Sequence, residues 1–268
     1  MKATISFINQ KGGCGKSSTC FHLSGAFAEA GFRVLLVDAD PQGSLSQGFF
    51  GSAVIEALGT EETLAAIFDD ECFAVAESLP APTPLPSIAA IRANHTLAIH
   101  NVPAPERTGL KQFALRSLLS DLSDFDLLLI DCPPNLYQCS WNALLASDFV
   151  VVPVPPEDFA TQGLRTIHLA IANAAALRPQ LRLLGHLVTR ADRRLLVHRS
   201  YEQRLRALYG PAILDTVVPE ASAFKVALSC RQPVSYYGPN TQAARVMNDL
   251  ASELMRRMRT DTTERGVA

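Results

Sequence analysis

The sequence has no long apolar run. Nothing in its 268 residues approaches the 18 or so apolar residues that a membrane-spanning helix needs. Met1 and Lys2 lead directly into a β-prone run, which is not the pattern of a secretory signal peptide. Both absences argue against an integral membrane protein and against a secreted one. We therefore expect a soluble, cytoplasmic protein.

The sequence also lacks any C-x-x-C pair among its six cysteines. Zinc sites and disulfide frameworks usually show such close spacing, so both are disfavoured. With 48% hydrophobic and 19% charged residues, the chain can bury a full α/β core as one domain. We expect the cysteines to be reduced and mostly buried in that core; they stand at positions 14, 20, 72, 132, 139 and 230.

The formal net charge of −2 hides an asymmetry between the two halves of the chain. Residues 1–150 hold 8 Lys/Arg against 16 Asp/Glu, whereas residues 151–268 hold 16 against 10. A basic half in a mildly acidic protein suggests one cationic face, and nucleic acid is the commonest partner of such a face. An ordinary solvated surface would give the same count, so charge alone leaves both interpretations open.

Apolar runs of strand length alternate with helix-length segments. This alternation is typical of a mainly parallel, twisted α/β sheet with helices on both faces, in which ligands bind beyond the carboxyl ends of the strands. The predicted strands are residues 3–9, 34–38, 97–102, 127–131, 149–154 and 183–189. The predicted helices are residues 19–30, 107–120, 136–146, 160–177 and 241–258.

One interval, residues 68–87, breaks this rhythm. It combines a short acidic run with prolines at positions 80, 82, 84 and 86. Alternating prolines keep a chain extended, and we expect them to keep this piece out of the sheet. The interval is therefore predicted to be a surface insertion within a single domain that spans residues 1–268. A proline-rich partner motif is an alternative interpretation.

A glycine-rich run joins the first predicted strand to the first predicted helix. From Asn9 to Ser18 it reads N-Q-K-G-G-C-G-K-S-S. Such a loop leaves backbone N–H groups pointing at one spot, at the positive end of the helix dipole, and that spot suits a polyphosphate. Lys16 would reach the β- and γ-phosphates, and the hydroxyl of Ser17 would bind Mg²⁺. The usual G-x-x-x-x-G-K-S/T pattern lacks the second lysine found here, Lys11.

Two further predicted strands end in carboxylates, at Asp38 and at Asp131. Beside a phosphate loop, an aspartate at the end of a buried strand can hold the Mg²⁺ shell, usually through water. We expect this role for Asp131. For Asp38, a helix cap or turn residue is the alternative to a role at the nucleotide.

Three sequence motifs resemble those of one family. K-G-G-C-G-K-S at residues 11–17 is similar to the deviant Walker A box, K-G-G-x-G-K-S/T, of the ParA/MinD group of P-loop ATPases. I-D-C-P-P at residues 130–134 resembles the family's Walker B sequence, and D-A-D-P-Q at residues 38–42 resembles its D-x-D-P-Q box. The resemblance covers about residues 1–50 and 105–258. It implies a P-loop NTPase fold, ATP and Mg²⁺ as cofactors, and a homodimer that forms with ATP.

The resemblance also implies roles for individual residues. Lys11 would reach the nucleotide of the partner subunit, as arginine fingers do, and would be catalytic together with Lys16 and Asp40. Asp38 would support Lys16 or the metal, and Glu157 would serve the dimer interface or the nucleotide sugar. The implied metal ligands, partly through water, are Ser17, Asp40 and Asp131. The implied nucleotide-binding residues are Lys11, Gly12, Gly13, Cys14, Gly15, Lys16, Ser17, Ser18 and Pro219.

ParA-type proteins bind DNA without sequence preference through basic residues in the second half of the chain, and Arg194 matches a family arginine of that kind. Guanidinium groups on phosphates provide affinity but do not distinguish bases. This chain departs from the family at Glu220, where many relatives are basic, although Lys225 and Arg231 compensate in part. The predicted DNA-binding residues are Arg190, Arg193, Arg194, Arg199, Lys225 and Arg231.

The resemblance implies an ATP-switched enzyme that partitions or positions cargo such as a plasmid, a chromosome or another assembly. ATP would close the dimer on nucleoid DNA, and a ParB-like or other adaptor would stimulate hydrolysis. The alternative is a MinD-like, membrane-associated positioning ATPase, but residues 255–264 contain no Phe, Trp or Leu for a membrane-binding helix. A relative with an iron–sulfur cluster between subunits is disfavoured, because Cys132 belongs to the I-D-C-P-P box.

Overall fold

The computed structural model describes residues 2–70, 76–157 and 160–265. Within them, strands form one sheet in the order β3-β4-β2-β5-β1-β6-β7. Every pairing in this sheet is parallel except that of β3 with β4. The strands are β1 (Ala3–Phe7), β2 (Val34–Asp38), β3 (Pro80–Pro82), β4 (Ile88–Ile91), β5 (Leu127–Asp131), β6 (Phe149–Val154) and β7 (Arg182–Val188).

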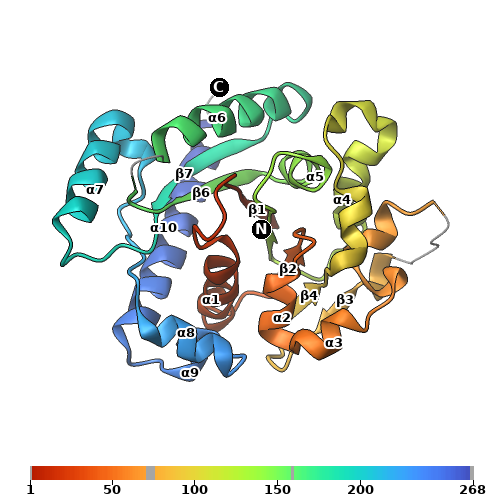
Figure 1. The fold of residues 1–268 in the computed structure, drawn as a ribbon, viewed down its shortest axis with the longest axis horizontal. Coiled ribbons are helices and arrows are strands. Elements are labelled where there is room, and N and C mark those ends of the chain that lie inside the picture. Colours follow the sequence, from red (N-terminus) through yellow and green to blue (C-terminus); the bar gives the residue numbers. More distant parts are fainter. Residues whose placement is uncertain (1, 71–75, 158–159, 266–268) are drawn as a thin grey trace.

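Helices cover both faces of the sheet, as Figure 1 shows, and the predicted fold class is confirmed. The predicted segment 107–120 is helical in two parts, a 3-10 turn at Gly109–Phe113 followed by α4. The α-helices are α1 (Lys16–Glu29), α2 (Ser44–Phe50), α3 (Ser52–Glu56), α4 (Ala114–Asp121), α5 (Gln138–Ala146), α6 (Ala160–Leu177), α7 (Leu196–Tyr209), α8 (Ser222–Ser229), α9 (Val234–Tyr237) and α10 (Gln242–Arg265).

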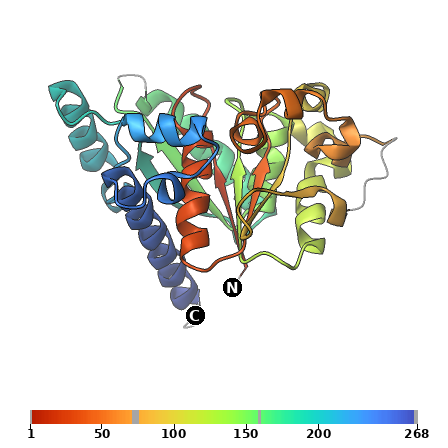
Figure 2. The same cartoon turned by 90° about the horizontal axis from the view of Figure 1, so that it is seen from below.

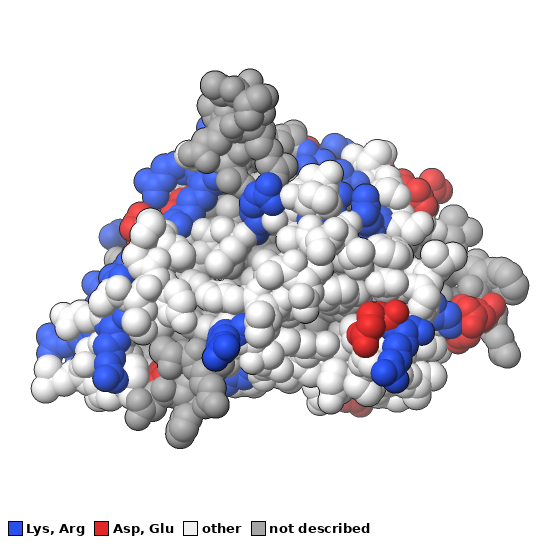
Figure 3. Space-filling model, turned by 90° about the horizontal axis from the view of Figure 1, so that it is seen from above, with Lys and Arg blue, Asp and Glu red and all other residues white. Residues whose placement is uncertain are grey.

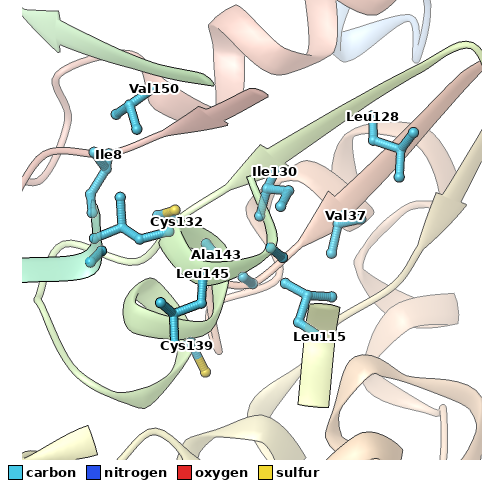
Figure 4. Packing of buried hydrophobic residues seen from close by; sticks show 14 of the residues in the cluster. Ile8, Val37, Leu115, Leu128, Ile130, Cys132, Cys139, Ala143, Leu145 and Val150 are labelled. Carbon is cyan, nitrogen blue, oxygen red and sulfur yellow. The ribbon is translucent and has the colours of Figure 1, made fainter. Parts of the chain in front are cut away.

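The sheet separates two apolar cores. Because successive side chains of a strand point to opposite faces, Leu128 and Ile130 of β5 enter one core and Leu127 and Leu129 enter the other. Figure 4 shows part of the first core, where Leu115 of α4 lies with residues of α5 beside the strands. Burial on both faces explains why the strands are runs of Val, Ile and Leu without polar alternation.

Helix α10 packs against α1 on the second face. Its predicted apolar stripe is confirmed, since each of its members is 9% exposed or less; they are Val246, Met247, Leu250, Leu254 and Met258. In Figure 2 the end of α10 lies on the same side of the molecule as the start of β1, opposite the loop that follows β1. Among the described residues, no helix is long and apolar enough to cross a membrane.

The predicted strand at 97–102 is wrong. The structure has a 3-10 helix, His95–His100, in its place, and the strand of this region is β4. The cause is Asn94, whose side-chain Oδ1 accepts hydrogen bonds from the backbone N–H and the hydroxyl of Thr96 at 3.0 and 2.6 Å. An asparagine that bonds its own backbone two residues on favours a turn over an extended chain.

The expectation that prolines keep residues 68–87 out of the sheet is also wrong. Strand β3 pairs antiparallel with β4 and forms the edge of the sheet, with Pro80 opposite Ile91 and Pro82 opposite Ala89. A proline lacks only the N–H, so it fits an edge strand whose other side needs no partner. Within this interval, residues 71–75, including Cys72, lie outside the described residues.

Candidate nucleotide site

The phosphate loop, residues 9–18, joins the end of β1 to the start of α1. Gly13 and Gly15 have φ angles of 70° and 90°, a left-handed backbone that only glycine adopts without strain. Gly15 is also the N-cap of α1 and has no side chain to cap it. The first N–H groups of the helix are therefore available to an anion at the positive end of the helix dipole.

Lys16 is only 6% exposed and lies inside this loop. Its Nζ donates to the carbonyl oxygens of Asn9 and Lys11 at 3.0 and 3.2 Å. Two residues from outside the loop, Pro153 and Thr189, hold it in place, and the sequence motifs did not single out either of them. Asn9 Nδ2 donates to Pro153 O at 2.6 Å, and Thr189 Oγ1 donates to Cys14 O at 2.7 Å. The cradle is thus built by the protein's own contacts.

Lys11 occupies a different position from Lys16. Its side chain is 36% exposed, and its Nζ forms an ion pair with Glu157, which follows β6. Among the described residues, its side chain contacts Glu157 and makes no hydrogen bond to the cradle that Lys16 fills. The structure therefore brings Lys11 and Glu157 together at the outer lip of the loop, where both can face a second molecule.

Asp38 and Asp131 end the neighbouring strands β2 and β5, in register with each other. Asp38 is buried and fully hydrogen-bonded: its Oδ2 accepts from the N–H and hydroxyl of Ser46 at 2.8 and 2.7 Å, and its Oδ1 accepts from Asp40 N at 3.2 Å. Burial nevertheless raises the pKa of Asp38 to about 7. By these contacts Asp38 holds the start of α2, the alternative role that the sequence left open, and it accepts no hydrogen bond from Lys16.

Asp131 is completely buried, and neither of its carboxylate oxygens accepts a hydrogen bond of normal geometry from the described residues, although the hydroxyl of Ser17 lies close enough to lower its pKa. Burial and the nearby Asp38 raise its pKa well above the ordinary value. A buried, unpartnered carboxylate is costly unless a ligand or ion satisfies it. Among the described residues no group of three or more His, Cys, Asp or Glu is placed to hold a metal. Mg²⁺ needs no such group, because one carboxylate with a nearby hydroxyl, water and phosphate oxygens suffices.

A cavity of about 420 Å³ opens beside the loop. Its lining includes Ser17 of the loop, Asp40 after β2, and Val218 and Pro219 from the segment before α8. The side chains of Phe21, Phe224 and Leu228 add apolar surface. A polar end that suits phosphates and an apolar wall that suits a base are the two requirements of a nucleotide pocket. Pro219, predicted from the family resemblance, lines the same cavity as the loop.

The cations predicted to contact DNA lie in different surroundings. Arg193 and Arg199 are exposed, and their side chains make no hydrogen bond or ion pair with the described residues. Arg194, 90% exposed, is paired with Asp192, and this pairing lowers the pKa of Asp192 to about 2. In Figure 3 Lys and Arg gather toward the side on which Figure 1 places α7, with some Asp and Glu among them.

The other three predicted DNA ligands have partners elsewhere in the protein. Arg190 and Lys225 both pair with Glu220 and line the nucleotide cavity. The guanidinium of Arg231 packs directly over Gly51. The sequence could not separate these three from Arg193 and Arg199, because their partners come from distant segments.

The described cysteines are free, and Cys14, Cys20, Cys132 and Cys139 are buried, whereas Cys230 is exposed. Cys132 follows β5 and Cys139 lies on α5, and both belong to the first core (Figure 4), where burial raises the pKa of both thiols. A cluster shared between subunits needs thiolates at the surface, so their position does not suit one.

The parallel sheet, the preformed anion cradle and the buried acidic strand ends define a P-loop nucleoside triphosphatase. The chain matches a family model described as an AAA domain over residues 2–183. It is 34% identical to the chromosome-partitioning ATPase Soj of Thermus thermophilus over 258 residues, and this alignment covers 95% of this chain and 96% of that protein. The chromosome partitioning protein ParA of Caulobacter vibrioides is 31% identical over 262 residues, with 95% and 94% covered.

Among solved structures, cobyrinic acid a,c-diamide synthase of Mycobacterium smegmatis with a bound ATP analogue and magnesium has a similar fold. Its TM-score is 0.78 at 26% identity, covering 97% of this chain and 96% of that one. The two sequence relatives confirm the family resemblance drawn from the three motifs. The chain belongs to the ParA-type partition ATPases of the P-loop class.

Proposed function

We propose that this protein is an ATPase that uses ATP and Mg²⁺ and acts as a dimeric switch to partition or position cargo. The observation that carries this proposal is the separation of the two loop lysines. Lys16 is buried among the loop carbonyls, whereas Lys11 lies on the outer lip beside Glu157. A cation outside its own cradle is placed to stabilise the phosphate charge of a second subunit's ATP.

Each residue of the site has a part in this function. Lys16 and the loop N–H groups bind the phosphates, and Ser17 and Asp131 hold Mg²⁺ partly through water. Magnesium neutralises charge on the phosphates. Asp40, partly exposed at the cavity, orients the attacking water. Hydrolysis is slow until a ParB-like or other adaptor completes the alignment, since phosphoryl transfer depends mostly on positioning and charge.

The dimer binds nucleoid DNA without sequence preference in the cytoplasm, and release follows hydrolysis. Arg193 and Arg199 are the strongest candidates for this contact, because their side chains are exposed and unpaired in the described structure. The similarity to partition proteins supports a plasmid, a chromosome or another large assembly as cargo.

The decisive experiment compares Lys11→Ala with Lys16→Ala. We expect Lys11→Ala to bind ATP but to lose the ATP-dependent dimer, and Lys16→Ala to lose ATP binding itself. Nucleotide affinity is measured by calorimetry, and mass by light scattering after gel filtration. A Lys11→Ala protein that dimerises with ATP like the wild type would contradict the proposed switch.

The DNA step is tested with Arg193→Ala, Arg194→Ala and, as a control, Arg116→Ala on α4, which Figure 1 places on the opposite side from α7. Arg193→Ala should weaken ATP-dependent binding equally for unrelated sequences and reduce the log–log salt slope by about 0.9 per lost phosphate contact. The Arg194→Ala effect should be smaller, because Asp192 already neutralises that guanidinium. Equal loss in the Arg116→Ala control would refute this footprint.

The alternative function is a MinD-like, membrane-associated positioning ATPase. Flotation of the ATP-bound wild type with anionic vesicles separates the two functions. We expect the protein to remain with the aqueous fraction, and cosedimentation with lipid would favour the alternative.

A further inference from the structure

Three charged side chains from three segments meet at the nucleotide cavity. Arg190 follows β7, Glu220 lies in the loop before α8, and Lys225 belongs to α8. Arg190 Nε donates to Glu220 Oε2 at 2.9 Å, and Lys225 Nζ lies 2.7 Å from Glu220 Oε1. One carboxylate thus bridges two cations beside the phosphate loop.

The same arginine also reaches the loop. Its Nη1 donates to the carbonyl oxygen of Gly13 at 2.7 Å. With Nε fixed by Glu220 and Nη1 fixed by Gly13, the guanidinium plane is held from two sides. Its third nitrogen, Nη2, has no hydrogen-bond partner in the described part of the chain. A planar guanidinium with one free edge is suited to a phosphate oxygen.

The backbone of Arg190 supports a role beyond packing. Its φ angle is 55°, a left-handed conformation that is unfavourable for a residue with a side chain. Such strained residues persist where the surrounding structure holds them, and they gather at ligand sites. The hydrogen bonds from Lys225 and Arg190 lower the pKa of Glu220, so this carboxyl is ionised at neutral pH. An approaching anion therefore meets a net positive group.

We propose that Arg190 binds the phosphate chain of the nucleotide held in its own subunit, and that Glu220 is the residue that positions it. This inference rests on the proposed ATPase function and assigns Arg190 to the nucleotide instead of to DNA. Arg190 adds a cis cation to the cavity, distinct from Lys16 within the loop and from Lys11 on its lip.

The test measures ATP and ADP affinity of Arg190→Met, with Arg116→Met on α4 as a control outside the cavity. Arg190→Met should bind nucleotide about tenfold more weakly, the loss of one charge-assisted hydrogen bond, and its affinity should depend less on salt. Arg116→Met should bind nucleotide like the wild type. If Arg190→Met loses affinity for both ATP and ADP, Arg190 contacts the α- or β-phosphate. If it loses affinity for ATP alone, Arg190 contacts the γ-phosphate.

The variant Glu220→Gln tests whether Glu220 acts by positioning Arg190 through a hydrogen bond or through its negative charge. The amide oxygen can still accept from Arg190 Nε, and the negative charge is gone, so nucleotide affinity should be equal to or tighter than that of the wild type. Wild-type affinity and salt dependence in Arg190→Met would overturn the inference, as would a tenfold loss in Glu220→Gln. The ATPase proposal would fail separately, through a wild type that binds no ATP.

Discussion

The strands β2 and β5 both end in a buried aspartate, but the two carboxylates differ in their hydrogen bonds. Asp38 and Asp131 are paired in register and are both buried. Asp38 accepts three hydrogen bonds from Ser46 and Asp40, whereas neither oxygen of Asp131 accepts a hydrogen bond of normal geometry from the described residues. The first carboxylate belongs to the scaffold that starts α2. We propose that the second binds a cation beside the phosphate loop.

Burial alone therefore does not identify a functional carboxylate. Both groups have a raised pKa, caused first by burial, so the direction of the pKa shift does not distinguish them. Their hydrogen bonds do, because a satisfied buried acid is stable by itself and an unsatisfied one is costly without its ligand. The matched substitutions Asp38→Asn and Asp131→Asn should therefore have different consequences.

The largest expected effect is the loss of hydrolysis in Asp131→Asn. The amide has nearly the same shape but carries no charge for Mg²⁺, so steady-state ATP hydrolysis should fall by about 100-fold or more. The measurement is phosphate release over a range of magnesium concentrations. Asp38→Asn serves as the control and should retain magnesium dependence. Equal loss in both variants would remove the distinction between the two strand ends.

The next effect is on stability and concerns Asp38→Asn. An amide offers one acceptor where the carboxylate offers two, so either the Ser46 groups or the N–H of Asp40 would face an NH₂ group. We expect a loss of roughly 1–3 kcal/mol in unfolding free energy, the cost of leaving a buried donor unpaired. Chemical denaturation without nucleotide measures it. An unchanged midpoint would show that these hydrogen bonds contribute nothing to the scaffold.

The sequence predicted much of this architecture because buried parallel strands and phosphate loops leave strong local signals. The runs 34–38, 127–131 and 149–154 match β2, β5 and β6 residue for residue. The region before β5 was less predictable. There the Asn94 side chain decides between strand and turn, and the edge strand β3 depends on a partner, β4, that is four residues long.

The site divides along the same line. Its loop and acidic strand ends are contiguous motifs, whereas the surroundings of Arg190 and Lys225 depend on Glu220 from a third segment. The family resemblance placed both cations among the predicted DNA-binding residues, yet folding brings them to the nucleotide cavity. The sequence favoured a metal role for Asp131 but left the role of Asp38 open, because one partner of Asp38 is a serine eight residues away.

The smallest expected effect is a pH dependence. A carboxyl whose pKa is raised in the folded state binds more protons there than in the unfolded state, so its contribution to stability is lost as pH rises. For Asp38 this loss begins at about pH 4, the unfolded pKa, and continues through the folded pKa of about 7. Buried His22 and His186, with pKa values lowered to about 4, act oppositely and lose their contribution as pH falls below about 6.5.

These opposing contributions make the wild-type profile uninformative by itself, but the histidines are the same in Asp131→Asn and cancel in the difference. Removing Asp131 removes one raised pKa. Without nucleotide, the stability advantage of Asp131→Asn over the wild type should therefore grow between pH 5.5 and pH 8. Denaturant midpoints of both proteins at each pH supply the measurement. Saturating Mg²⁺ and ATP should reverse the advantage, because the cation then compensates the Asp131 charge. If the stability difference between the two proteins does not change with pH, Asp131 carries no unpaired charge.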